Sequence, residues 1–244
     1  MPNIWTIYRR ELAAYFNSPI AYIFICAFLA IMAFFFFIFY RFFSQPNPDL
    51  RTYFEILPLA FFIFIPAITM RLWSEEKKQG TLEMLMTLPL KTWEVVVGKF
   101  LAAYSILTIT LLLTIIVPLS TSFVLQNMDG QALVANYIGA FLIAGVYIAI
   151  GSWISALTRE QTVAFVVSVV ACALVCFMGF PNVIDWINRS VWDGMGRFVG
   201  YFGTFFHYQK FAQGQVSAVD VVYALGMIGL FLGLNNFAVE SRKY

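Results

Sequence analysis

The chain has 244 residues, of which 61% are hydrophobic and 11% are charged, and its formal net charge is +2. Soluble domains carry about 25% charged residues, so this chain cannot cover its surface with polar groups in water. Binding of nucleic acid needs an excess of Lys and Arg to contact the phosphates, and the small net charge of this chain does not supply it. The composition therefore predicts a protein embedded in the lipid bilayer and excludes a nucleic-acid-binding protein.

Residues 1–19 predict a helix that lies on the membrane surface before the first span. Aromatic and aliphatic residues recur at helical spacing on one face, and the charged residues lie away from it. This division is typical of an interfacial amphipathic helix. Asn17-Ser18-Pro19 should end it, because the residue before a proline disfavours the helical conformation. The residues expected to form this interfacial elbow include Arg9, Arg10, Glu11, Tyr15 and Phe16.

Six apolar stretches reach or approach the length of about 20 residues that a helix needs to cross the bilayer. They are apolar all round and show no alternation with a period of two, which predicts a helical bundle. Pro58 and Pro66 should kink the second stretch, and Pro118 should bend the third. The stretches are Ile20–Tyr40, Tyr53–Met70, Val95–Leu125, Leu133–Leu157, Thr162–Phe180 and Val219–Val239.

Six spans would place both termini on one side of the membrane. With this topology, ten Lys and Arg residues lie on the side of the termini and of the 71–94 loop, and five lie on the other side. Cytoplasmic loops carry the excess of Lys and Arg. Both termini and the 71–94 loop are therefore expected to be cytoplasmic, in a bacterial inner membrane.

The segment Arg71–Lys91 is a polar island between two apolar stretches. Ser74 is expected to cap a short helix, Gly80 should interrupt it, and Pro89 should close a second short helix with an apolar stripe. Two short helices joined at a glycine would form a rigid cytoplasmic elbow, residues 74–88, on which a soluble partner could act. The residues expected to form its docking surface are Ser74, Glu75, Glu76, Lys77, Gly80, Thr81, Leu82, Glu83, Leu85, Met86 and Pro89.

The link 181–218 is too rich in aromatic residues for a flexible connection, so short helices at the outer membrane interface are expected there. The single histidine, His207, lies within it and is interpreted as an interfacial hydrogen-bonding residue rather than a proton relay. In the last span, Gly226, Gly229 and Gly233 suggest close helix packing within the chain first and a dimer face second. No catalytic motif or metal-ligand spacing is present, and Cys172 and Cys176 are interpreted as buried apolar residues.

Three stretches together resemble a known family. The pattern Arg71, Ser74-Glu75-Glu76-Lys77, Gly80-Thr81, Glu83, Leu85 and Pro89 resembles the cytoplasmic loop of ABC-2 type transporter permeases. The start, Arg10-Glu11-Leu12 and Tyr15-Phe16-Asn17-Ser18-Pro19, is similar to their N-terminal elbow. The closing segment, with His207-Tyr208, Phe211, Gly214 and Asp220-Val221-Val222-Tyr223, resembles the gliding-motility-type branch.

The resemblance implies one six-span membrane domain over residues 1–244, without catalytic residues and without a bound cofactor or metal. It implies a separate ATPase dimer that carries ATP and Mg and docks on the 74–88 elbow. It also implies a second six-span unit, either identical or a different membrane protein with an outer domain. The expected function is the permease subunit of an exporter. The open alternatives are a scaffold that anchors an ATPase for assembly or mechanical work, and a secondary transporter that works without ATP.

Overall fold

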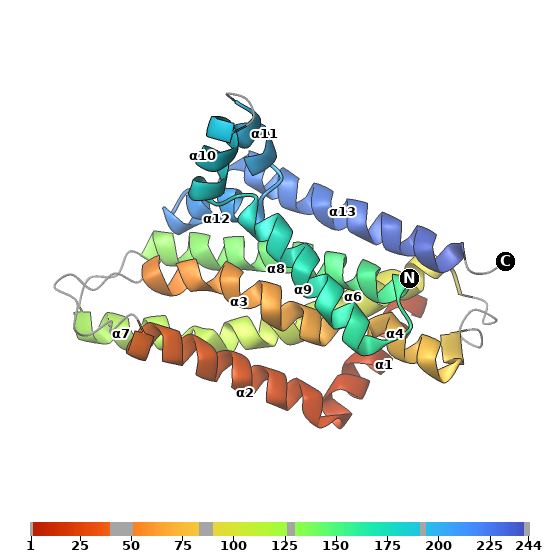
Figure 1. The fold of residues 1–244 in the computed structure, drawn as a ribbon. Helices are drawn as coiled ribbons and strands as arrows, with labels where there is room; N and C mark the ends of the chain where they lie inside the picture. The colour runs from red at the N-terminus through yellow and green to blue at the C-terminus, as the bar shows by residue number, and fades with distance from the viewer. Residues whose placement is uncertain (1, 40–50, 83–89, 126–129, 191–193, 242–244) are drawn as a thin grey trace.

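The computed structural model describes residues 2–39, 51–82, 90–125, 130–190 and 194–241. Within these ranges the chain is helical and contains no strand, which confirms the expected all-α class. The long helices run side by side in an elongated bundle (Figure 1). The helices are α1 (Pro2–Asn17), α2 (Pro19–Ala33), η1 (Phe34–Phe39), α3 (Arg51–Thr69), α4 (Arg71–Gln79), α6 (Thr92–Thr114), α7 (Ile116–Leu125), α8 (Gly130–Leu157), α9 (Gln161–Phe177), α10 (Pro181–Ser190), α11 (Met195–Gly200), α12 (Thr204–Ala212) and α13 (Ala218–Glu240).

Five stretches of the described chain are long and apolar enough to cross a membrane. They are Pro19–Phe39, Tyr53–Gln79, Thr92–Thr121, Gly130–Leu157 and Ala218–Glu240. The expected fifth span corresponds to α9, which has 17 residues. It reaches the required length only together with α10, from which it is bent by 75°. The described residues therefore contain five candidate spans, or six if the bent pair counts as one.

The second candidate span is longer than the sequence predicts. It was expected to end at Met70, but helix α4 continues α3 after a break at that residue, so that the stretch runs to Gln79. Pro58 and Pro66 both lie inside α3, and neither ends it. The first half of the expected elbow is therefore the extended end of a span and not a separate short helix.

The third candidate span is interrupted near Pro118, as the sequence predicts. Helix α6 ends at Thr114, four residues before this proline, whose ring nitrogen cannot donate to the Thr114 carbonyl. The hydroxyl of Tyr53 donates a hydrogen bond to that carbonyl, with 3.5 Å between the two oxygens. A side chain from the second span thus satisfies the backbone group that the proline leaves without its helical partner.

Helix α8 occupies the centre of the bundle and packs against α3, α4, α6, α9, α12 and α13. Its glycines let these helices approach closely. A Cβ atom at Gly139 would lie 2.6 Å from Phe211, and one at Gly151 would lie 2.1 Å from the Oγ1 atom of Thr69. These two glycines therefore fix the positions of α12 and α3 on α8.

The glycines of α13 do not pack against the part of the chain that the structure describes. A Cβ atom added at Gly226, Gly229 or Gly233 would meet none of its atoms within 4 Å. The first interpretation of this motif, close packing inside the chain, is wrong, because α13 contacts α8 through its opposite face. Buried Ala224 and Asn235 belong to that packed face.

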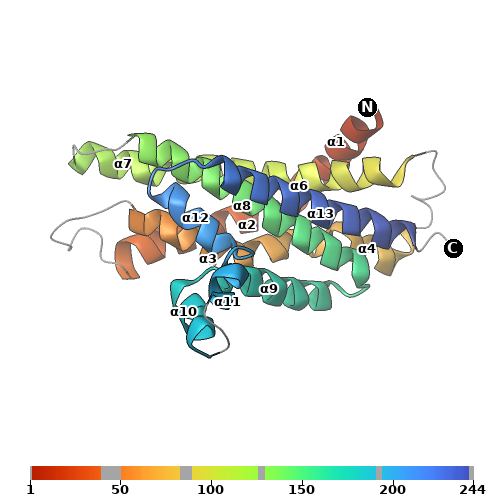
Figure 2. The same cartoon turned by 90° about the horizontal axis from the view of Figure 1, so that it is seen from above.

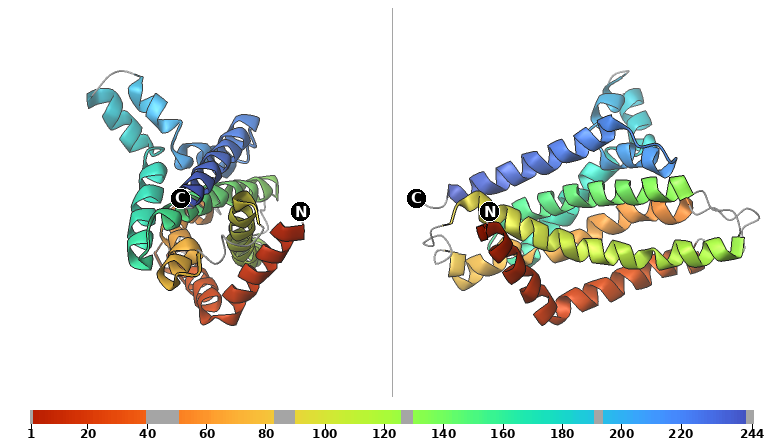
Figure 3. Two further views of the ribbon diagram at one scale, coloured as in Figure 1. Left: turned by 90° about the vertical axis from the view of Figure 1, so that its right-hand side faces the viewer. Right: turned by 180° about the vertical axis from the view of Figure 1, so that it is seen from behind.

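The two ends of the bundle differ. Helix α1 begins and α13 ends where α4 lies, and we call this the α4 end (Figures 1 and 2). Helix α1 crosses the bundle obliquely there, while α10 and α11 project from its side toward the opposite end (Figure 3). Helix α12 folds back against α8, α3 and α9. The link 181–218 therefore contains short helices, as expected.

Candidate functional site

Helix α4 carries most of the described docking residues. It begins at Arg71, and no side chain caps it. Ser74 was expected to be the N-cap, but it lies inside the helix, is buried, and donates its hydroxyl proton to the carbonyl of Met70. Gly80 ends the helix in a left-handed conformation with φ of 71°, which confirms the predicted interruption.

The tip of α4 is open to a partner, and its base is not. Lys78, Gln79 and Gly80 are exposed, whereas Leu72, Trp73 and Ser74 are buried. Thr81 is exposed, and Leu82 is half-buried and packs against the core of the bundle. The remaining predicted docking residues, Glu83, Leu85, Met86 and Pro89, lie outside the described residues.

A serine of α8 holds the junction between α3 and α4. The hydroxyl oxygen of Ser155 accepts hydrogen bonds from the backbone N–H of Trp73 at 3.1 Å and of Ser74 at 3.2 Å. It donates in turn to the carbonyl of Met70 at 2.9 Å. A side chain inserted into the helical hydrogen-bond ladder is a common cause of a break in a helix. Ser155 therefore explains why the helical hydrogen bonding of α3 is interrupted at Met70. It also explains why α4 can begin directly after this residue, since Ser155 bonds to the backbone N–H groups of its first turn.

Neighbouring polar groups extend this junction to α13. The hydroxyl of Ser152 accepts from the side-chain amide of Asn235 at 2.7 Å and from the indole N–H of Trp73 at 3.4 Å. Ser152 and Trp73 are completely buried, as is Asn235. Buried polar groups of this kind cost free energy unless they are paired, so the network fixes one relative position of α4, α8 and α13.

A buried lysine of α6 holds the other side of α4. The Nζ atom of Lys99 lies 2.9 Å from Oε1 of Glu76 on α4 and 3.3 Å from Oε1 of Glu11 on α1. Its side chain is only 1% exposed, and its Nζ lies 5.2 Å from the centre of the Trp73 ring. Arg10 completes the cluster, with 2.7 Å to Glu11 and 3.5 Å to Glu76. One set of charges thus joins three helices.

Helix α1 packs against the protein through part of its predicted apolar face, since Tyr15 is buried and its hydroxyl donates to the carbonyl of Ile68 at 3.0 Å. Glu11 was expected to point away from the apolar face, yet it lies between Ile7 and Tyr15 on the side that faces α6 and α4. Burial alone would raise the pKa of the Glu11 carboxyl, but the charges of Lys99 and Arg10 bring this pKa below its ordinary value. Trp5 is 61% exposed and lies outside this contact.

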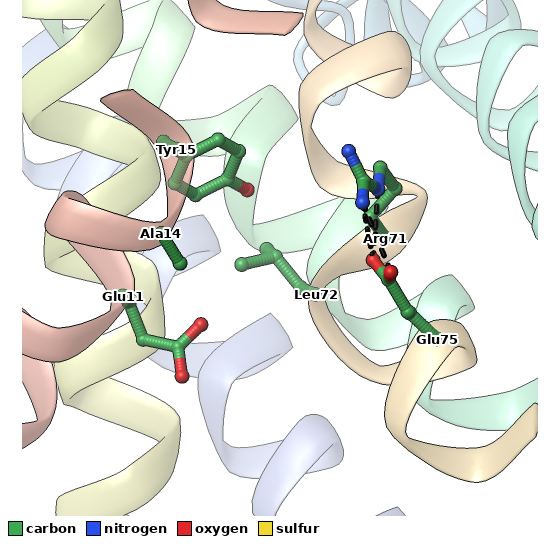
Figure 4. A pocket seen from close by; sticks show the side chains of 6 residues that line it. All are labelled: Glu11, Ala14, Tyr15, Arg71, Leu72 and Glu75. Atoms are coloured by element: carbon green, nitrogen blue, oxygen red, sulfur yellow. Dashed lines mark hydrogen bonds and ion pairs between the residues drawn. The ribbon is translucent and has the colours of Figure 1, made fainter. Parts of the chain in front are cut away.

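A cavity of about 80 Å³ separates α1 from α4 (Figure 4). The Arg71–Glu75 ion pair lines one wall, with two hydrogen bonds of 2.8 and 2.9 Å. Glu11 and Tyr15 line the other wall, and the side chain of Leu72 lies between the two walls. Pockets for drug-sized ligands usually measure about 300 Å³ or more, so this cavity is smaller than an ordinary ligand pocket.

A comparison with protein families decides the family. The profile described as ABC-2 family transporter protein matches residues 14–189, which is more than half of the chain. The protein belongs to the ABC-2 transporter family. A search of curated protein sequences found no significant match. With several apolar helices long enough to cross a bilayer, this ABC-2 family protein is a multi-pass membrane protein.

The family match also states what kind of subunit this is. ABC-2 permeases are membrane subunits that generally work with a separate ABC ATPase and are not themselves the ATPase. Among the described residues, no group of three or more His, Cys, Asp or Glu side chains could hold a metal ion.

Three residues of the site in this ABC-2 family protein were missed in the sequence. Lys99 was counted only as one cation near the start of a span, although a charged residue in an apolar segment is by itself a sign of function. Ser152 and Ser155 are small polar residues in a long apolar helix, and such residues are common in membrane helices. Nothing in the sequence links these serines to the break at Met70, because that contact joins residues 85 positions apart.

Proposed function

We propose that the protein is the permease subunit of an ABC-2 exporter, driven by a separate ATPase that docks on the 74–88 elbow. The observation that carries this proposal is the position of α4. Its tip is exposed, and its base is joined to α1 and α6 through Lys99 and to α8 and α13 through Ser155 and Ser152. A force applied at the tip would therefore reach four other helices.

The mechanism follows from this connection. ATP and Mg bind to the ATPase dimer, and closure of that dimer displaces the elbow. Because α4 continues the second span, its displacement moves α3, and the polar contacts of Ser155 and Lys99 carry the movement to the neighbouring helices. The spans then rearrange and move the cargo. The chain itself supplies no catalytic group to this cycle.

We further propose that residues 1–244 form one membrane domain of six spans, with α9 as the fifth. Two such units, identical or different, would pack side by side and handle cargo between them. The closing segment with His207 and Asp220 favours the gliding-motility-type branch, in which the second unit can be a membrane protein with an outer domain.

The proposed orientation places the α4 end in the cytoplasm of a bacterium with the chain in its inner membrane. Cysteine introduced at Gln79 should then react only with reagents that enter the cell, and cysteine at Ser190 should react from outside. Both side chains are exposed. Labelling of the Gln79 variant from outside would contradict the orientation and the docking proposal together.

The experiment that tests the function is purification of the native complex, followed by reconstitution into liposomes. We expect the chain to bring an ATPase subunit and a second six-span unit with it, and ATP hydrolysis to depend on the membrane subunits. A pure complex with a single six-span unit and no ATPase would contradict the proposal.

A further inference from the structure

A second buried charge cluster lies away from α4, where α12 meets the start of α13. The Nδ1 atom of His207 lies 2.6 Å from Oδ1 of Asp220, and the Nζ atom of Lys210 lies 3.1 Å from the same oxygen. The Asp220 side chain is 0% exposed, and that of His207 is 2% exposed. This cluster has no role in the proposed docking of an ATPase.

Both nitrogens of the His207 ring face hydrogen-bond acceptors. Its Nε2 atom lies 2.9 Å from the backbone carbonyl oxygen of Tyr201, and its Nδ1 atom faces the carboxylate of Asp220. A carbonyl oxygen can only accept, so Nε2 must carry a proton. A second proton must then lie between Nδ1 and Asp220, because two lone pairs at 2.6 Å would repel each other.

The surroundings favour placing this second proton on the ring. Asp220 lies in the first turn of α13, where the helix dipole stabilises a negative charge. Lys210 also favours the ionised carboxylate. The other carboxylate oxygen, Oδ2, is buried without a hydrogen-bond partner among the described residues, so a proton placed on it would have no acceptor to donate to. An imidazolium paired with a carboxylate is the consistent assignment.

The same ring fastens the turn between α11 and α12 to α13. His207 holds the carbonyl of Tyr201, and the hydroxyl of Tyr223 on α13 donates to the carbonyl of Phe202 at 2.6 Å. The rings of His207 and Tyr223 are stacked, with centroids 3.9 Å apart. A cation over an aromatic face is favourable, so the protonated ring suits this stack as well.

We propose that His207 and Asp220 form a proton-binding latch, in which the doubly protonated histidine ring fastens the α11–α12 turn to the start of α13. When the ring loses its second proton, one of its two hydrogen bonds must be lost, and the turn is released from one side. The latch makes the packing of the α11–α12 turn against α13 depend on pH. The proposal of the latch does not rest on the docking of an ATPase.

The titratable groups near α12 come from several helices. Lys210 is on α12 itself, Asp220 and Tyr223 are on α13, and Tyr147 of α8 pairs its hydroxyl with Thr204 at 2.6 Å. The others on neighbouring helices are Tyr137 on α8, Tyr53 and Glu55 on α3, and Cys172 and Cys176 on α9. Of these side chains, Asp220 makes the hydrogen bond to the His207 ring, Tyr223 stacks on it, and Lys210 shares its carboxylate.

The chain contains one histidine, so the ring can be observed directly. The full protein, purified with a tag free of histidine and placed in nanodiscs, would be labelled with ¹⁵N-histidine and studied by NMR. At about pH 7.5, where a free histidine is mostly neutral, both ring nitrogens should give the shifts of an imidazolium. One protonated and one unprotonated nitrogen in the wild-type protein would overturn the proposal.

Two variants separate the latch from its surroundings. Asp220→Asn removes the negative charge that holds the second proton, so the His207 ring in this variant should be neutral at the same pH. Tyr223→Phe keeps both acceptors of the ring and removes only the bond to Phe202, so its ring should stay protonated. The wild-type spectrum alone decides the proton assignment, even if Asp220→Asn fails to fold.

The release of the turn needs its own measurement. A spin label at Tyr201→Cys, a position that is 49% exposed and whose backbone carbonyl bonds to His207, would be placed in a Cys26→Ala background, and its mobility followed as the pH rises. The label should become mobile as the ring loses its second proton, and it should be mobile at every pH in His207→Phe. Equal mobility in both proteins at every pH would overturn the latch.

Discussion

The ammonium nitrogen of Lys99 lies 2.9 Å from Oε1 of Glu76, with the lysine side chain only 1% exposed. Through this contact, the third candidate span holds the extended end of the second. Glu11 of α1 joins the same ammonium group at 3.3 Å. A lysine in an apolar helix would be costly without such partners, because an unpaired buried charge costs several kcal/mol.

Replacing Lys99 by Met should therefore destabilise the protein strongly. Two partly buried carboxylates would lose their shared cation and keep only Arg10, and breaking a buried pair from one side costs up to about 3–5 kcal/mol. Thermal unfolding in detergent measures the effect. Lys78→Met is the matched control, since the Lys78–Glu160 pair is 59% exposed on both sides and should be worth about 1 kcal/mol or less. Equal effects of the two variants would contradict the role given to Lys99.

Ser155→Ala should loosen the junction between α3 and α4. The backbone N–H groups of Trp73 and Ser74 would lose their acceptor in a buried place, at a cost of about 1–3 kcal/mol. Hydrogen exchange of the α4 amides should become faster, while that of α6 stays unchanged. Ser120→Ala is the control, because Ser120 is exposed and its hydroxyl donates to the Val117 carbonyl in its own helix. Unchanged exchange in Ser155→Ala would show that the serine does not hold the junction.

The sequence predicts the helical class, the approximate ends of most candidate spans and the break at Gly80, but it places the end of the second span at Met70 instead of Gln79. These features depend on local properties, namely apolar length and the conformational freedom of glycine. The contacts of Lys99 and Ser155 were not predicted, because they join residues far apart in the chain. The packing of the glycines was predicted wrongly for α13, since a Gly-x-x-x-Gly pattern does not say which face of a helix meets a neighbour.

The glycines of α8 and α13 offer a matched pair of substitutions. Gly151→Ala places a Cβ atom 2.1 Å from the Oγ1 atom of Thr69, whereas Gly229→Ala places one in open space. The first should lower the unfolding temperature of the purified chain, and the second should keep or raise it, because alanine is the better helix former. A loss of stability in Gly229→Ala would show that this face packs against a partner in the sample.

The docking of α1 should weaken in acid. The pKa of Glu11 lies below its ordinary value of 4.5, because Lys99 and Arg10 outweigh the effect of burial. A group with a lowered pKa stabilises the folded state fully above its ordinary value, and this contribution is lost as the pH falls through the lowered value. The unfolding temperatures of wild type and Glu11→Gln should therefore differ at neutral pH and converge in acid. A difference that stays constant with pH would contradict this assignment.

The choice of residues for a docking test follows from the structure. Glu75 pairs with Arg71, Glu76 pairs with Lys99, and Leu82 packs against the bundle. Substitutions at these positions would disturb the chain itself as well as any docking. Leu85 and Met86 belong to the predicted apolar stripe beyond Gly80, so they are the better positions for introducing charge.

The most direct test is co-purification of the ATPase with a tagged chain that carries Leu85→Asp and Met86→Asp. A charge buried in the contact with the ATPase would be unpaired and cost several kcal/mol, so the ATPase should be lost while membrane insertion is kept. Val216→Asp is the control, since Val216 is 51% exposed and comes just before α13, and it is the other end of α13 that lies near α4 (Figure 1). We predict that wild type and the control retain the ATPase and the double variant does not. Full retention of ATPase binding and activity in the double variant would contradict the docking elbow.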